Sequence, residues 1–124
     1  MADKSGNVTL DNGTITYSSD VIATIAGLAA VEIEGISGMS GNLVSGITEF
    51  LGKKDFTKGI KVDIIESDVT VDIYLVVKYG IEIHKAAAKV QENVHKAIES
   101  MTSLHPVATN IHVQGIDLGA NDEQ

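Results

Sequence analysis

The chain lacks several residue types that particular functions require. It has no cysteine, which excludes disulfides, thiolate metal sites and cysteine catalysis. It also has no arginine, and its 9 lysines stand against 17 acidic residues, for a net charge of −8. Binding to nucleic acid or to an anionic lipid surface needs a basic patch, so we expect neither. A small domain without disulfides also fits the reducing cytoplasm.

Long apolar runs are scarce as well. The most apolar run in the first half is VIATIAGLAAV, residues 21–31, which is too short for a transmembrane helix of about 20 residues. The N-terminal MADKSGN has no apolar core of the kind a secretory signal needs. We therefore expect a soluble, cytoplasmic protein that does not insert into the membrane. It should consist of a flexible N-terminus at 1–7, a single domain at 8–118 and a flexible acidic tail at 119–124.

The first half of the chain predicts a hairpin followed by two helices. Asn12-Gly13 within VTLDNGTITY is a strong signal for a type I′ turn. Residues 18–35 begin with serines that can cap a helix and end in glycine. This helix is apolar on most of its circumference, so we expect it in the core or in an oligomer contact. A flexible turn to about Gly41 and a short helix over 42–51 should follow.

The second half opens with two strands. Residues 60–66 and 69–79 alternate between apolar and mostly polar positions, which is typical of strands with one buried face. A two-residue loop between them pairs Ile64 with Val71, and every pair on the inner face is then apolar. The pattern excludes a slip by one residue, because that slip would exchange the two faces.

A long helix and a last strand complete the predicted core. Residues 83–101 repeat apolar side chains at spacings of three and four, so Met101 is expected on the buried stripe. Residues 107–116 alternate again, with Val107, Ile111 and Val113 expected inward. The predicted fold class is α+β. It has a helix-strand-strand-helix-strand core, with a small mixed sheet covered by helices on one face, and a short N-terminal hairpin.

The sequence contains few arrangements that suggest chemistry. In the register above, Asp63 lies opposite Asp72 on the outward face, with His112 nearby if the last strand runs alongside. These groups could bind a cation, but hard cations need more oxygen ligands. We therefore favour a solvated pair relieved by Lys61. The four histidines lack zinc spacing, and there is no phosphate loop or GxSxG elbow. We predict no catalytic residue, no cofactor and no enzyme activity.

Two stretches resemble the alkaline shock protein family of Gram-positive bacteria, also called the envelope stress response family. TITYSSDVIATIAGLAAVEIEGISGM (14–39) is similar to the opening of that family. VTVDIYLVVKYGIEIHKAAAKVQENVHKAIESMT (69–102) and NIHVQGI (110–116) are similar to its second half. The chain departs from the family at MTSLHPVAT, where members often carry a glycine at the place of Ser103 and no proline.

The resemblance implies a non-enzymatic, cytoplasmic, stress-induced protein of cell-envelope homeostasis. It also implies self-association and, for some members, attachment at the membrane periphery through a separate membrane-anchored protein. The residues themselves support a protein contact, because the outward sheet face is only partly polar. The predicted contact residues on this face are Tyr74, Val76, Asn110, His112 and Gln114. The alternative is a module that binds a small ligand or divalent cation on the same face through Asp63, Asp72 and His112.

Overall fold

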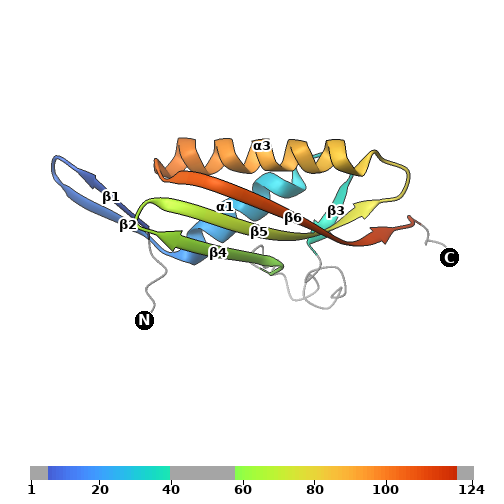
Figure 1. The fold of residues 1–124 in the computed structure, drawn as a ribbon, viewed down its shortest axis with the longest axis horizontal. Helices are drawn as coiled ribbons and strands as arrows, with labels where there is room; N and C mark the ends of the chain where they lie inside the picture. Colours follow the sequence, from blue (N-terminus) through green and yellow to red (C-terminus); the bar gives the residue numbers. More distant parts are fainter. Residues whose placement is uncertain (1–5, 40–57, 120–124) are drawn as a thin grey trace.

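The structure is a computed structural model that describes residues 6–39 and 58–119. The helix predicted over 42–51 and most of the two predicted flexible ends lie outside the described residues. In chain order, the helices and strands are β1 (Gly6–Leu10), β2 (Gly13–Tyr17), α1 (Ser19–Val31), β3 (Ile36–Met39), β4 (Ile60–Ile65), β5 (Asp68–Lys78), α3 (Ile83–Thr102) and β6 (His105–Asp117). Figure 1 shows this arrangement, which confirms the predicted α+β class.

The strand β5 lies at the centre of a mixed sheet. Along one edge it pairs in parallel with β6 over its whole length. Along the other edge it pairs antiparallel first with β4 and then, beyond the end of β4, with β3. The strand β3 replaces the flexible turn predicted up to Gly41. Its four residues are too short and too rich in small side chains to show alternation, so only the pairing with β5 makes it a strand.

The hairpin register differs from the predicted one. Ile64 pairs with Val69 instead of Val71, because the turn lies at Glu66-Ser67, one residue earlier than expected. Glu66 adopts the left-handed backbone conformation, with φ 58°. Moving the turn by one residue shifts each pair by two positions and leaves every side chain on its predicted face. Apolar alternation cannot distinguish such registers.

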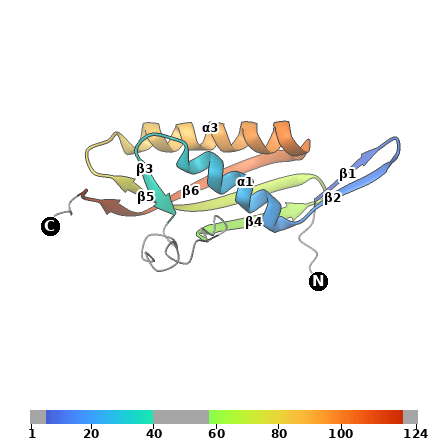
Figure 2. The ribbon, with the colours of Figure 1, turned by 180° about the vertical axis from the view of Figure 1, so that it is seen from behind.

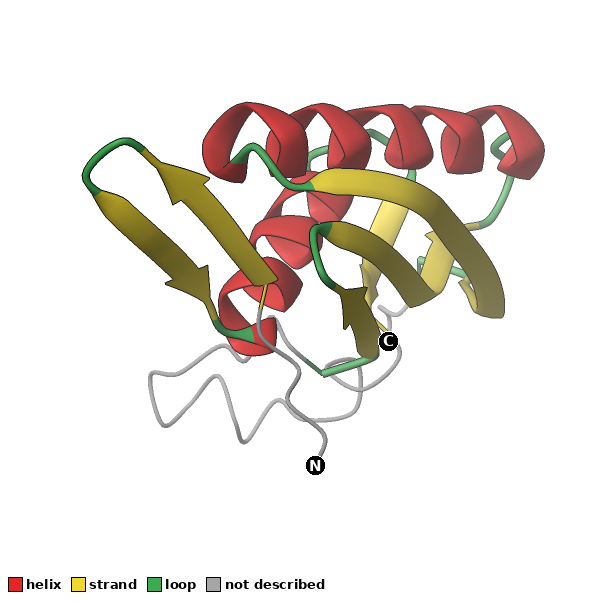
Figure 3. Ribbon diagram, turned by 60° about the vertical axis from the view of Figure 1, so that its left-hand side comes forward, coloured by secondary structure: helices red, strands yellow, loops and turns green. Residues whose placement is uncertain are grey.

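The two helices cover one face of the sheet, as Figures 2 and 3 show. The odd-numbered residues of β5 point into this layer, and each is at most 1% exposed: Val69, Val71, Ile73, Leu75 and Val77. Helix α1 begins after Ser18, whose hydroxyl accepts a hydrogen bond from the Val21 N–H at 3.3 Å. Its alanines and isoleucines are buried against α3 and the sheet, so the predicted burial of this helix in the core is confirmed.

Helix α3 ends in a tight turn around Thr102, the residue that continues its buried stripe in steps of four. The Thr102 hydroxyl donates to the Ile98 carbonyl at 2.6 Å and accepts from the Leu104 N–H at 3.0 Å. Ser103 follows with φ 64°, the left-handed conformation that glycine favours at the end of a helix. Thr102 and not Met101 completes the buried stripe. The prediction for Met101 is wrong, because its side chain is 66% exposed.

The last strand contains two bulges, after Pro106 and after Val113. They interrupt the alternation, and β6 also lies at the edge of the sheet. Val107 was expected inward but falls in the first bulge and is 51% exposed. Val113 lies beside the inward Leu75, as its predicted direction requires, but it is 39% exposed because no strand among the described residues covers this edge. A period-two pattern predicts faces only while the strand stays in register.

The hairpin of β1 and β2 projects from one end of the domain (Figures 1 and 3). Its base is packed closely, because a Cβ added at Gly6 would lie 2.9 Å from a methyl group of Leu104. The hairpin is confirmed, but its turn consists of Asp11 and Asn12. Neither has positive φ, so the turn is not type I′.

Candidate interaction surface on the outer face of the sheet

Polar side chains from three strands meet on the face of the sheet that the helices leave open. On β5, Asp72 lies opposite Lys61 of β4 and beside Asn110 of β6. Two residues further along β5, Tyr74 lies beside His112 of β6. We call these five residues the outer-face cluster. They come together because even-numbered residues of β5 point away from the helices.

The outer-face cluster is ordered by hydrogen bonds to Asp72. His112 Nε2 lies 3.0 Å from Asp72 Oδ1, and the Asn110 amide donates to the same oxygen at 3.2 Å. The hydrogen bond from His112 is the main reason that the pKa of Asp72 lies below the usual carboxyl value, with further help from Asn110 and the Lys61 charge. Asp72 is therefore ionised at neutral pH.

An aromatic pair forms the apolar part of the outer-face cluster. The rings of Tyr74 and His112 are stacked, with centroids 4.5 Å apart and an angle of 13° between their planes. The ammonium of Lys61 lies 5.7 Å from the centre of the Tyr74 ring, within reach of a cation–π interaction. Both rings are only partly buried. The surface thus presents a pre-ordered aromatic platform with charged groups beside it.

Two of the five predicted contact residues do not join this platform. Val76 is only 3% exposed and sits between Gly38 of β3 and Gly115 of β6, so it offers almost no surface. Gln114 is exposed but falls in the second bulge of β6, which brings Gly115 beside Val76 instead. The sequence predicts the polar alternation, but nothing in it marks the position of the bulge.

The predicted pair of aspartates is not formed. Asp63 lies opposite Thr70, because of the shifted hairpin register, and Lys61 takes its place opposite Asp72. Within residues 6–39 and 58–119, no group of three or more histidine, aspartate or glutamate side chains is placed to hold a metal ion. The described residues also include no helix that is long and apolar enough to span a bilayer.

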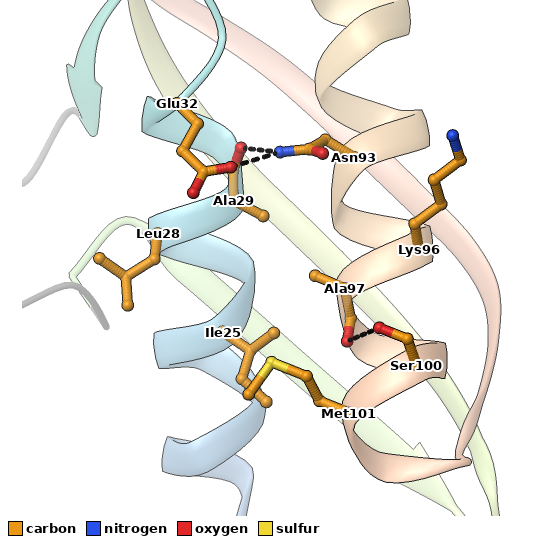
Figure 4. A pocket seen from close by; sticks show the side chains of 9 residues that line it. All are labelled: Ile25, Leu28, Ala29, Glu32, Asn93, Lys96, Ala97, Ser100 and Met101. Carbon is orange, nitrogen blue, oxygen red and sulfur yellow. Dashed lines mark hydrogen bonds between the residues drawn. The ribbon is translucent and has the colours of Figure 1, made fainter.

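A groove of about 360 Å³ lies between α1 and α3 (Figure 4). The Asn93 amide reaches across it to the Ala29 carbonyl and the Glu32 carboxylate, at 2.8 and 3.0 Å. Ile25 and Met101 approach each other further along the groove. Its polar side chains mostly bond other groups of the groove wall, so they do not form the convergent set that a catalytic site requires.

One contact between strands was not predicted. The Ser37 hydroxyl of β3 donates to Asp117 Oδ2 of β6 at 2.7 Å. This bond, with a second from the Gly119 N–H, lowers the pKa of Asp117 below its usual value. The two residues are 80 positions apart, and only the pairing of both strands with β5 brings them together.

Comparison with known proteins identifies related sequences. The sequence model of the ASP23 family, described by a cell envelope-related function, matches residues 7–118. YqhY of Bacillus subtilis is 40% identical over 112 residues, which cover 90% of this chain and 83% of YqhY. YloU of the same organism is 37% identical over 106 residues, covering 84% of this chain and 88% of YloU. A stress response regulator gls24 homolog of Streptococcus pyogenes is 26% identical, over 84% of this chain and 59% of that protein.

Solved structures with a similar fold include the MamM CTD. Its zinc form has a TM-score of 0.51 at 11% identity and covers 82% of this chain and 90% of that chain. Its copper form has a TM-score of 0.51 at 10% identity and covers 81% of this chain and 100% of that chain. At this identity the likeness concerns the fold alone.

Proposed function

Because the chain belongs to the ASP23 family, we propose that it acts without catalysis, through self-association and through docking to a membrane-anchored protein. The function of the family is related to the cell envelope, and homologues in Streptococcus pyogenes are named stress response regulators. In this proposal the chain is cytoplasmic and stays at the membrane periphery through its partner. The resemblance noted in the sequence to the alkaline shock proteins is confirmed by these relatives.

The stacked pair of Tyr74 and His112 is the single observation that supports docking at the outer face most strongly. Aromatic side chains dominate the energy of many interfaces, and they do so best when they lose little freedom on binding. Tyr74 already rests on His112, which is held in turn by Asp72. A partner that covers Tyr74 therefore orders few additional groups.

Charge favours a protein anchor over the lipid itself. A chain with a net charge of −8 is repelled by anionic lipid headgroups. Cytoplasmic segments next to transmembrane helices carry an excess of lysine and arginine. A basic segment of this kind complements the ionised Asp72 and the acidic surface in general. Docking should therefore weaken as the salt concentration rises.

The proposed docking is tested by replacing Tyr74 with lysine. Loss of an aromatic anchor commonly costs more than about 1.4 kcal/mol, so the dissociation constant measured by sedimentation with membranes should rise about tenfold. Met101→Lys is the matched control, because Met101 is 66% exposed on the helix side and should leave sedimentation unchanged. Equal loss in both variants, or a chain that never sediments with membranes, would contradict docking at this face.

Cation binding is the second candidate function. It is favoured by the fold shared with the zinc and copper forms of the MamM CTD, and by the Asp72 carboxylate beside His112. Thermal unfolding with and without zinc or copper ions tests this candidate. Binding predicts a higher midpoint temperature with the metal, and no such rise in Asp72→Asn. An identical midpoint with and without metal would exclude it.

A further inference from the structure

The strand β6 has one edge that no other strand among the described residues pairs with. The Gln91 side chain of α3 donates to the Thr109 carbonyl at 3.0 Å. The Thr109 carbonyl therefore points away from β5, towards the free edge. Backbone groups alternate along a strand, so Ile111 and Val113 direct their N–H and carbonyl groups the same way as Thr109. These three residues lie between the two bulges of β6 and form a regular edge segment.

The strand β6 itself carries no fixed charge between its two ends. Between His105 and Asp117, β6 contains no lysine, aspartate or glutamate, although 26 of the 124 residues of the chain are charged. On helix α3, Ala87 lies one turn before Gln91 and His95 one turn after it, and the Glu99 carboxylate lies 3.8 Å from His95 Nε2. Depletion of charge together with exposed apolar groups is typical of the centre of an interface.

We propose that a second copy of the chain pairs with this edge, β6 against β6 in antiparallel orientation, about a twofold axis at Ile111. The proposal rests on the self-association proposed above and assigns a surface to it. In this register Ile111 faces its own copy, and Thr109 faces Val113 of the second copy. All three pairs fall within the regular edge segment, and the two sheets become one continuous sheet.

Charge selects a second copy as the occupant. Two chains of net charge −8 repel each other, and a contact surface without carboxylates keeps this repulsion small. The uncharged edge of β6 meets this condition. Antiparallel pairing also brings the His105 end of each strand towards the Asp117 end of the other, so the acidic end meets a histidine and not a second carboxylate.

The bond from Gln91 competes with this pairing. Thr109 can give its carbonyl to the second copy only if the Gln91 side chain releases it. The association should therefore be reversible and concentration-dependent. Lysine on an exposed edge is a common protection against strand pairing, and this edge has none between His105 and Asp117.

Sedimentation equilibrium of the full chain, Val113→Lys and Ile65→Lys tests the assignment. Val113→Lys places a charge beside the axis, and the dimer dissociation constant should rise at least tenfold. Ile65→Lys is the matched control, because Ile65 is 67% exposed on β4 at the opposite edge, and its constant should not change. If Val113→Lys associates as the unchanged chain does, the β6 edge is the wrong surface while the proposed self-association stands. A strictly monomeric chain at all concentrations overturns both.

Cysteine pairing provides a second test that reports the register. The chain has no cysteine of its own, so introduced thiols are the only ones present. Facing residues in such a pair have Cα atoms about 5.5 Å apart, within the range of a disulfide. A mixture of Thr109→Cys and Val113→Cys should form mixed disulfides at least tenfold faster than either variant alone. Equal rates in the mixture and the separate variants would overturn the antiparallel pairing about Ile111.

Discussion

The two faces of β5 obey the same alternation but are built on different principles. The inner face consists of five aliphatic residues that two helices cover completely. The outer face presents Asp72 and Tyr74, each of which depends on a neighbour from β6. The inner residues all pack into one apolar core without directional contacts, whereas each of these two outer residues has a specific partner.

This difference separates stability from recognition. Apolar burial is additive over area and insensitive to direction, so the inner face should dominate the free energy of unfolding. Hydrogen bonds and stacking on an exposed face contribute little net free energy, but they fix the orientation of groups. Substitutions on the two faces should therefore differ both in size and in the property they change.

The largest effect is expected from Ile73→Ala on the inner face. Ile73 is fully buried, and removal of such a side chain usually costs about 2–5 kcal/mol because a cavity remains. Urea unfolding measures this loss. Its sequence neighbour Tyr74 supplies the comparison, since Tyr74→Ala should cost less than about 1 kcal/mol on the exposed face. Similar losses at both positions would remove the distinction between the faces.

A smaller effect is expected at Val76, which points to the outer face but is buried. Val76 is buried between Gly38 and Gly115, so it should behave like a core residue despite its outward direction. Val76→Ala should cost about 1.5–2.5 kcal/mol in the same unfolding measurement. A loss below about 0.5 kcal/mol would show that burial at this position contributes nothing to stability.

The smallest effect is expected from Asp72→Asn, and it should depend on pH. Hydrogen bonds favour the ionised carboxylate, so its pKa is lower in the folded chain than in the unfolded chain. The resulting stability is present above the ordinary carboxyl pKa and is lost as the pH falls through the folded value. At neutral pH the variant should be less stable by at most about 1 kcal/mol.

The pH dependence of this difference is the control. The stabilities of the unchanged chain and of Asp72→Asn should differ near pH 5 and converge as the pH falls through the lowered pKa of Asp72. A difference that stays constant over this range would mean that Asp72 acts through packing and not through its charge.

The sequence predicts the fold well where the spacing of apolar residues matches the face of the helix or strand that is buried. The central strand, the long helix and the buried α1 all follow from apolar spacing, because each packs one continuous face against the same core. The turn residue Ser103 shows the limit of such patterns. Its left-handed conformation is imposed by the end of α3, and the serine itself does not indicate it.

The outer-face cluster could be predicted only in part. Alternation places Tyr74, Asn110 and His112 outward, but it does not specify which strand lies beside which. The hairpin register shifted by two residues and thereby replaced Asp63 with Lys61 opposite Asp72. The second bulge of β6 likewise places Gly115, and not Gln114, beside Val76. Both depend on local backbone geometry, which hydrophobic patterns do not encode.

The central strand β5 pairs with two antiparallel strands along the same edge, β4 beside its first half and β3 beside its second half. The first, β4, is joined to β5 by a tight turn, so the β4–β5 hairpin can form early in folding. The second, β3, belongs to a part of the chain more than 30 residues earlier, and closing that loop costs entropy. Amide hydrogens near Lys78 should consequently exchange with solvent sooner than those near Val71. Local unfolding of β5 should begin at its C-terminal end, beside β3.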